Sequence, residues 1–397
     1  MWHVMRQDIP IALETLTASV AGAVEIEQCS DGFAPRRLPL WTRDRQASAG
    51  IQHTSGASAG IRLRLLTAAR TLRLDLRVIS SAETLGIRPH PVAVIAEVEG
   101  EQCAWRELIG ARAIDVAQVA DPESHGAEVM VVLALDGDGR TERAVEIWLP
   151  HNAETVVRGA AADAPVHIAQ QRPTARWLHH GSSISHGLEA VGPLGPWPQQ
   201  AARELGVSLT NLGFAGDAML DPFVAQTIAT QPADVITLKL GINPVTTEAM
   251  KERVFGPAVH GFLDLVREGH PATPIIVISA IAAPGFEDEA GPSREVAPGR
   301  YAGTPRLATD REGLVTLAHS RAIIADVLAH RADDANLAYL SGLRLLGLAD
   351  ARHLYDGLHP DQAGYDLIAR RFVELARDAT SPLGPAFLAA PVTRLGV

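Results

Sequence analysis

The chain has 397 residues, of which 47% are hydrophobic and 20% are charged, and 35 Lys+Arg against 46 Asp+Glu give a formal net charge of −11. This length and apolar content exclude a disordered chain and predict two domains, or three, each able to bury its own core. Both halves of the chain are acidic, so a nucleic acid or an anionic membrane is disfavoured as a partner.

Cysteine usage and the N-terminal charges indicate the compartment. The two cysteines, Cys29 and Cys103, form neither a disulfide framework nor a zinc-ligand cluster, so we expect no metal site and a cytoplasmic protein. Charges between Arg6 and Glu27 interrupt any apolar leader, and no secretory signal is expected. The longest apolar run, around residues 274–286, is too short to span a bilayer.

Residues 20–150 show a hydrophobic period close to two, which is typical of half-buried strands. The clearest candidates are residues 61–65, 72–78, 92–98, 127–135 and 143–149, separated by turn signals such as residues 136–139. Many short strands with little helical period predict a β-sandwich or jelly roll over residues 1–165, and residues 159–165 are predicted to be a linker. This domain lacks an aromatic cluster on alternate positions, so we expect it to wall a cleft and not to bind glycans.

From residue 176 onward, short apolar runs alternate with amphipathic stretches, which is typical of βαβ units. Strands are predicted at 175–180, 209–214, 235–240, 275–280 and 337–340, and helices at 196–206, 219–230, 247–268, 313–332 and 361–378. Residues 171–397 are therefore expected to form a three-layer α/β/α domain with a doubly wound parallel sheet. In such sheets the chemistry lies outside the carboxyl ends of the strands.

A serine pair follows the first of these predicted strands. Ser183 stands at a sharp strand-to-helix turn, where its hydroxyl would be held clear of the sheet beside free N–H groups. A serine at this place is also an ordinary helix cap, so Ser183 taken alone supports both a nucleophile and a capping residue.

Two hydrogen-bond donors follow the second and third predicted strands. Gly216 offers a backbone N–H and Asn243 a side-chain amide, and two or three such donors aimed at one point make an oxyanion hole. Both residue types are also common in loops, where they only form turns.

An acid-base pair precedes the last predicted helix. Asp356 and His359 lie three positions apart, so the carboxylate can accept from Nδ1 of the imidazole and leave Nε2 free as a base. The alternative is a surface helix start, in which the aspartate caps and the histidine is solvated. All of these candidates follow predicted strands and so fall at one edge of the sheet, which favours a catalytic role over separate structural roles.

These blocks together resemble the SGNH (GDSL-like) hydrolase superfamily. The resemblance lies in residues 181–185, in Gly216 of Asn-Leu-Gly-Phe-Ala-Gly, in Asn243 of Gly-Ile-Asn-Pro, and in Asp356-Gly-Leu-His359-Pro, and it covers residues 175–378. It implies a flavodoxin-like catalytic domain, Ser183 as nucleophile, His359 as base, Asp356 as its orienting carboxylate, and Gly216 and Asn243 as oxyanion donors. Two positions depart from the family pattern, because Ser182 and Pro244 stand where aspartates are usual.

A β-sandwich ahead of such a domain resembles two-domain carbohydrate esterases and certain acyltransferases that act on bacterial polyketides. The resemblance implies a serine esterase that hydrolyses short-chain, acetyl-type esters of a small or carbohydrate substrate through an acyl-enzyme, with no cofactor. Two alternatives stay open: an acyltransferase that passes the acyl group to a hydroxyl of a secondary metabolite, and a non-catalytic carbohydrate-binding protein. Residues 283–306 are long for a βα loop and are expected to form a lid or pocket wall, with Phe286 and Tyr301 lining it.

Overall fold

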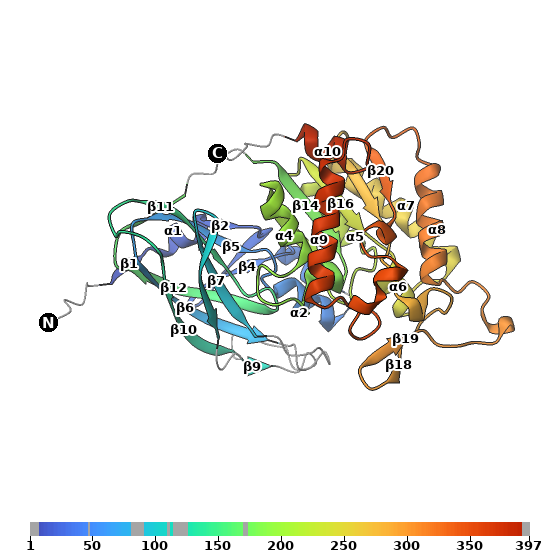
Figure 1. Ribbon diagram of the computed structural model, residues 1–397, viewed down its shortest axis with the longest axis horizontal. Helices are drawn as coiled ribbons and strands as arrows, with labels where there is room; N and C mark the ends of the chain where they lie inside the picture. The colour runs from blue at the N-terminus through green and yellow to red at the C-terminus, as the bar shows by residue number, and fades with distance from the viewer. Residues whose placement is uncertain are drawn as a thin grey trace. The chain divides into compact units, whose positions relative to one another are not determined.

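The computed structural model describes residues 8–46, 48–80, 91–108, 112–113, 126–169 and 174–390 (Figure 1). The chain divides into two compact units, Met1–Arg172 with Val191–Leu194 and Pro173–Ala190 with Gly195–Val397. No helix within these described ranges is both long and apolar enough to cross a membrane.

The N-terminal unit is built from two largely antiparallel sheets. One has the order β10-β6-β12-β4-β3, with bounds Ala127–Ala134, Thr71–Ser80, Ala153–Ala162, Gly32–Arg36 and Glu25–Cys29, and β1 (Ile9–Ile11) and β9 (Arg112–Ala113) pair with β12 and β6. The other has the order β13-β5-β11-β7-β8, with bounds Val166–Ile168, Arg62–Thr67, Arg143–Trp148, Ala93–Val98 and Glu101–Glu107, and β2 (Val20–Ala21) pairs with β5. Helices α1 (Leu13–Ala18) and α2 (Ala49–Gly56) and a 3₁₀ turn at Leu40–Arg45 lie between strands.

The alternating sequence of β6 explains why the two sheets pack. Leu72, Leu74 and Leu76 are buried, whereas Arg73 and Asp75 between them lie on the other, partly exposed face. Leucines, valines and alanines from both sheets form one continuous buried core. The predicted β-sandwich is confirmed.

The prediction of a linker at residues 159–165 is wrong. Strand β12 continues to Ala162, where it pairs with Leu72 of β6, and Ala160 and Ala161 are buried. The register shifts between Val157 and Gly159, as at a β-bulge. A run of glycine and alanine has a low strand propensity, so its sequence does not indicate a strand. Pairing with the neighbouring strand nevertheless makes it part of the sheet.

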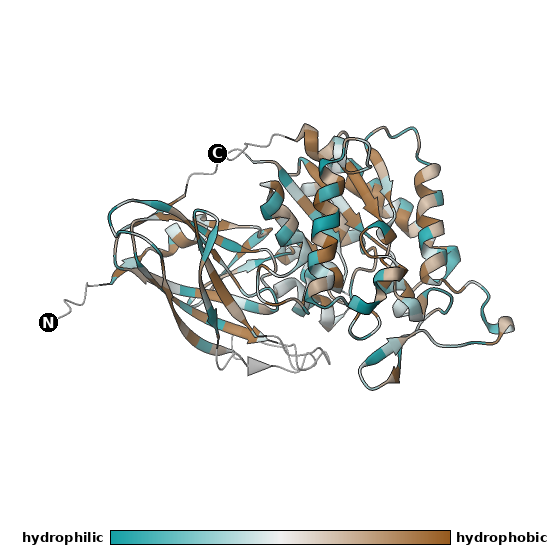
Figure 2. Ribbon diagram, viewed as in Figure 1, coloured by the Kyte–Doolittle hydropathy of each residue, from teal (hydrophilic) through white to brown (hydrophobic). Residues whose placement is uncertain are grey.

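The C-terminal unit contains a parallel sheet with the order β15-β14-β16-β17-β20. Its strands span Ser208–Gly213, Arg176–Gly181, Val235–Lys239, Ile275–Ile278 and Leu337–Leu340, close to the predicted ranges. Numbered along the chain, the order is 2-1-3-4-5, which is that of flavodoxin-like doubly wound folds. The predicted fold class is therefore confirmed, and strands such as β17, with the sequence Ile-Ile-Val-Ile, are among the brown, apolar ribbons of this unit in Figure 2.

Aromatic side chains attach helices to both faces of this sheet. On one face Trp177 of β14 stacks on Phe372, with ring centroids 4.9 Å apart, and also contacts Trp197 and Phe387. On the other face His180 stacks on Phe262. The first group belongs to α4 (Trp197–Leu205), α9 (Gln362–Arg377) and α10 (Gly384–Ala389), while α7 (Glu252–Gly269) packs on the opposite face with α5 (Pro222–Thr230) and α8 (Leu317–Ala329).

Short elements lie at the carboxyl ends of the strands. They are α3 (Ser183–His186), α6 (Ile242–Thr246), the hairpin β18 (Arg294–Ala297) and β19 (Arg300–Ala302), and 3₁₀ turns at Pro284–Phe286, Ala308–Asp310, Gly342–Arg344 and Leu348–His353. The helix predicted over 247–268 is thus preceded by a separate turn of helix that follows β16 directly. These short pieces carry the residues described below.

We expect Phe372→Ala to lower the free energy of unfolding of this unit by about 3–5 kcal/mol, because it removes a fully buried ring from the stack on Trp177. Urea unfolding followed by tryptophan fluorescence measures the change. Leu388→Ala, at a side chain that is 56% exposed, is the matched control and should stay within about 0.5 kcal/mol of the wild type. Equal losses in both variants would contradict the packing role of Phe372.

Candidate active site

Ser183 is the first residue of α3, two positions after the end of β14. Its Oγ lies 2.9 Å from Nε2 of His359, and the residue is 8% exposed. The turn fits against the neighbouring strand because Gly213 of β15 has no side chain: a Cβ there would lie 2.3 Å from the backbone nitrogen of His186. The fold thus fixes the serine at the carboxyl edge of the sheet.

Asp356 makes three hydrogen bonds within its loop, two of them with His359. Its Oδ2 lies 2.7 Å from Nδ1 of the imidazole, and its Oδ1 accepts from the backbone N–H groups of Leu358 and His359 at 2.8 and 2.7 Å. The loop closes on itself because the N–H of Tyr355 donates to the carbonyl of His359. Nε2 of the imidazole is thereby directed at Ser183.

Burial and pairing act in opposite directions on the pKa values of this pair. Burial raises the pKa of Asp356, but hydrogen bonds and the charge of His359 outweigh it, so the pKa lies below its usual value. Burial lowers the pKa of His359, but the hydrogen bond and charge of Asp356, with a contribution from Glu189, raise it above 6.5. A base of this strength can take the proton of a serine hydroxyl.

Gly216 and Asn243 reach the same edge from β15 and β16, the strands on either side of β14. The backbone N–H of Ala218 donates to Oδ1 of Asn243 at 3.1 Å, which turns the amide NH2 group away from this contact. Gly216 is exposed and adopts a φ of +77°, and within the described chain no hydrogen bond uses the backbone N–H of Gly216 or of Ser183. These three donors could therefore bind an oxyanion.

A second polar network lies behind the nucleophile, and sequence patterns did not reveal it. Nε2 of His179 lies 2.8 Å from Oγ of Ser185, and Nδ1 lies 2.7 Å from Oγ1 of Thr237. The side-chain amide of Asn211 donates to the carbonyl of Ser185. Ser185 is fully buried, and burial holds the pKa of His179 well below its ordinary value. This network supports the turn that carries Ser183.

The segment predicted as a lid forms the β18–β19 hairpin. It is bonded to the loop of Asp356 and to the helix of Asn243, because Tyr301 N–H donates to the carbonyl of Asp356 at 2.7 Å and Ser293 N–H donates to the carbonyl of Thr246 in α6 at 2.7 Å. A Cβ at Gly357, whose φ is +90°, would lie 2.9 Å from the carbonyl oxygen of Tyr301. The expectation that Phe286 lines a pocket is wrong, because its ring is fully buried.

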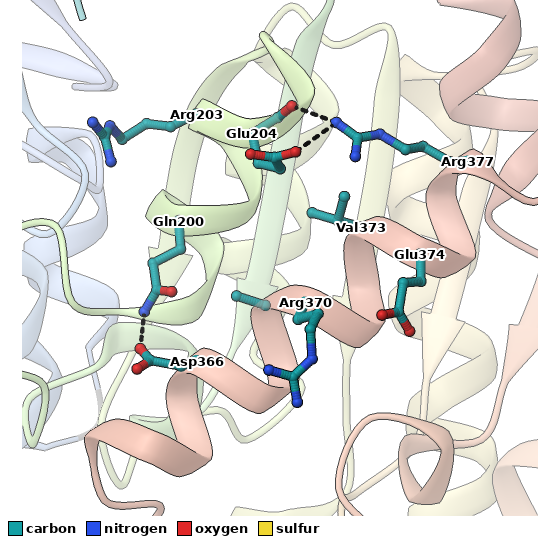
Figure 3. A pocket seen from close by; sticks show the side chains of 9 residues that line it. Gln200, Arg203, Glu204, Asp366, Arg370, Val373, Glu374 and Arg377 are labelled. Atoms are coloured by element: carbon teal, nitrogen blue, oxygen red, sulfur yellow. Dashed lines mark hydrogen bonds and ion pairs between the residues drawn. The ribbon is translucent and has the colours of Figure 1, made fainter. Parts of the chain in front are cut away.

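A surface pocket of about 580 Å³ lies between α4 and α9 and contains none of these residues (Figure 3). Two polar pairs line this pocket: Arg377 donates to Glu204, and the side-chain amide of Gln200 donates to Asp366. Its remaining lining includes Arg203, Ala369, Arg370, Val373 and Glu374. In the part of the chain that the structure describes, no group of three or more His, Cys, Asp or Glu side chains could hold a metal ion, and neither Cys29 nor Cys103 forms a disulfide.

Comparisons with known proteins relate both units to solved structures. The salicylyl-acyltransferase SsfX3 from a tetracycline biosynthetic pathway is 25% identical with a TM-score of 0.75, over 92% of this chain and 95% of that chain. A GDSL-like protein from Bacteroides ovatus is 20% identical with a TM-score of 0.66, over 94% and 97%. A family two carbohydrate esterase from Clostridium thermocellum is 13% identical with a TM-score of 0.57, over 90% and 98%. The last two likenesses concern the fold.

A search of curated proteins by sequence finds no match. A family model of GDSL-like lipases and acylhydrolases matches residues 180–367, which contain the serine turn, both donor loops and the acid-base loop. Together with the two-domain architecture, this match places the C-terminal unit of the chain in the GDSL-like lipase/acylhydrolase family, the SGNH hydrolases.

Proposed function

We propose that this protein is a serine esterase that hydrolyses short-chain, acetyl-type esters of a small or carbohydrate substrate through an acyl-enzyme on Ser183. The hydrogen-bonded chain from Ser183 through His359 to Asp356 carries this proposal. The alcohol and acyl chain are suggested by likeness to carbohydrate esterases. The chemistry itself rests on the geometry of the site.

In the first half of the reaction, His359 takes the hydroxyl proton as Ser183 Oγ attacks the ester carbonyl. Negative charge develops on the carbonyl oxygen, where the N–H groups of Ser183 and Gly216 and the amide of Asn243 stabilise it. Collapse of the tetrahedral intermediate transfers the proton from His359 to the leaving alcohol. Water then attacks the acyl-enzyme, and the same histidine acts as base again.

An acyltransferase is the second candidate, and likeness to the salicylyl-acyltransferase SsfX3 over nearly the whole chain favours it. Both activities share the same acyl-enzyme. They differ in whether water or an acceptor hydroxyl attacks it, so the two proposals separate only after the acyl-enzyme has formed.

Treatment with a fluorophosphonate tests the nucleophile, because this probe forms a stable adduct with an activated serine. Peptide mass spectrometry should find one adduct, on the peptide that contains Ser183, and none in Ser183→Ala or His359→Ala. Ser30→Ala, which removes an exposed hydroxyl from the N-terminal unit, is the control and should keep the adduct on Ser183. No adduct, or one elsewhere, would contradict the assignment and favour a carbohydrate-binding protein.

Asn243→Ala should lower kcat on a nitrophenyl acetate about 10²–10³-fold, with little change in KM, because an oxyanion donor acts on charge that develops in the transition state. Asn336→Ala, which removes an exposed amide just before the amino end of β20, away from the carboxyl edge of the sheet, is the matched control and should keep the wild-type kcat. A rise in KM with an unchanged kcat would instead indicate a role in substrate binding.

The rate should depend on the protonation of His359, whose neutral form is the base. Because the pKa of His359 is raised, kcat/KM should fall as the pH drops through a value above 6.5. Asp356→Asn removes the charge that raises this pKa, so the acid limb should move to lower pH while kcat falls about 10³–10⁴-fold. An unchanged acid limb in this variant would assign the titration to another group.

Ester hydrolysis followed with and without added acceptor alcohols separates the esterase from the transferase. For an esterase, we expect the released acid to equal the released nitrophenol at every acceptor concentration. A transferase would instead yield a new ester that increases with acceptor, at the expense of free acid.

A further inference from the structure

Asn243, the proposed side-chain donor to the oxyanion, lies on α6, a helix of only five residues. Its backbone carbonyl accepts from the N–H of Thr247 at 3.1 Å and from Oγ1 of Thr247 at 2.7 Å. The next residue, Glu248, has a φ of +53°, a left-handed conformation that is unfavourable for a residue with a Cβ. Such a conformation persists only where surrounding contacts hold it. The geometry at Asn243 therefore depends on what holds the chain at Glu248.

Arg306 holds Glu248 from the segment that follows the β18–β19 hairpin. Its Nη2 lies 2.5 Å from Oε2 of Glu248, and the same nitrogen donates to the carbonyl of Gly291 at 3.3 Å. The two side chains are 27% and 23% exposed, so salt and solvent screen this ion pair less than a fully exposed one. Arg306 thus bridges the residue after α6 and the segment before the hairpin.

The backbone of the segment before the hairpin also bonds to the end of α6, and the two lie side by side (Figure 1). Gly291 N–H donates to the carbonyl of Val245 at 3.1 Å, and Ser293 N–H donates to that of Thr246 at 2.7 Å. A Cβ at Gly291 would lie 2.4 Å from the carbonyl oxygen of Val245, so a side chain there would force the two segments apart. Arg306 adds a third attachment, two residues after Thr246.

We propose that Arg306 is a positioning residue for the oxyanion donor Asn243 and that it acts through Glu248 and the end of α6. This inference rests on the proposed function for its kinetic consequence. When the ion pair is lost, Glu248 is no longer held in its left-handed conformation, and the bonds from Thr247 to the Asn243 carbonyl loosen with it. The amide of Asn243 then spends less time at the position where the ester oxygen becomes negative. Arg306 needs no contact with substrate for this effect.

The position of the Asn243 amide can be measured without any substrate. The chain has four asparagines, so NMR of protein labelled with ¹⁵N at asparagine gives few side-chain signals, and the one absent from Asn243→Ala is that of Asn243. In Arg306→Ala, we expect this signal to shift or broaden while the other three stay in place. Arg377→Ala is the matched control, because Arg377 also pairs with a glutamate, Glu204, but at the end of α9 opposite the acid-base loop. It should leave all four signals unchanged.

Kinetics give the second readout. Arg306→Ala should lower kcat on a nitrophenyl acetate about tenfold with little change in KM. Because the effect passes through Asn243, it should vanish in an Asn243→Ala background, where the double variant should keep kcat within about twofold of Asn243→Ala alone. Glu248→Ala should reproduce the loss of Arg306→Ala, and Arg306→Lys, which keeps the charge without the guanidinium fork, should recover part of it. Circular dichroism verifies that each variant is folded.

An Asn243 signal in Arg306→Ala that coincides with that of the wild type would overturn the inference, whatever the activity. An equal fall in kcat with and without Asn243 would also overturn it, because general damage to the fold multiplies with the loss of the donor. A displaced Asn243 signal together with no esterase or transferase activity in the wild type would instead support the positioning role and contradict the proposed function. The two failures are therefore distinguishable.

Discussion

The hydrogen bond between Ser183 Oγ and His359 Nε2 joins two loops that are 176 positions apart in the chain. It exists because parallel strands deliver their following loops to one edge of the sheet. The first strand of the unit, β14, lies at an interior position between β15 and β16, so the serine turn has neighbours on both sides. The donor loops follow those two neighbouring strands. Behind the serine turn, His179 contacts both Ser185 and Thr237, which ties this turn to β16.

The positions of the catalytic candidates were accessible from sequence because each follows an apolar run with the length and composition of a buried strand. Ser183, Gly216 and Asn243 come directly after such runs, and the Asp356 to His359 spacing is short enough for a turn to bring the side chains together. The alternating leucines of β6 likewise predicted the sandwich. These signals are local in the sequence, and the structure keeps the strands and turns that they predict.

Features that depend on contacts between distant segments were not accessible. The hydrogen bond from Ala218 N–H to Asn243, and those that join His179 to Ser185 and Thr237, connect residues whose spacing obeys no period. The end of β12 was mistaken for a linker because glycine and alanine have weak strand propensity. Pairing with β6 makes Ala160 and Ala161 part of the sheet. The prediction for Phe286 failed because the ring of an aromatic residue in a polar loop can pack into the protein core as well as face a pocket.

The hairpin at Arg294–Ala302 combines a constrained base with a free tip. At its base, the Tyr301 carbonyl leaves no room for a side chain at Gly357, and the Tyr301 N–H is bonded to the Asp356 carbonyl. At its tip, residues 295–299 are exposed. Substitutions at the exposed tip should therefore disturb the Ser183, His359 and Asp356 geometry little. A substitution at Gly357, by contrast, should be poorly tolerated. A new substrate range could evolve on this hairpin without disturbing the chemistry beneath it.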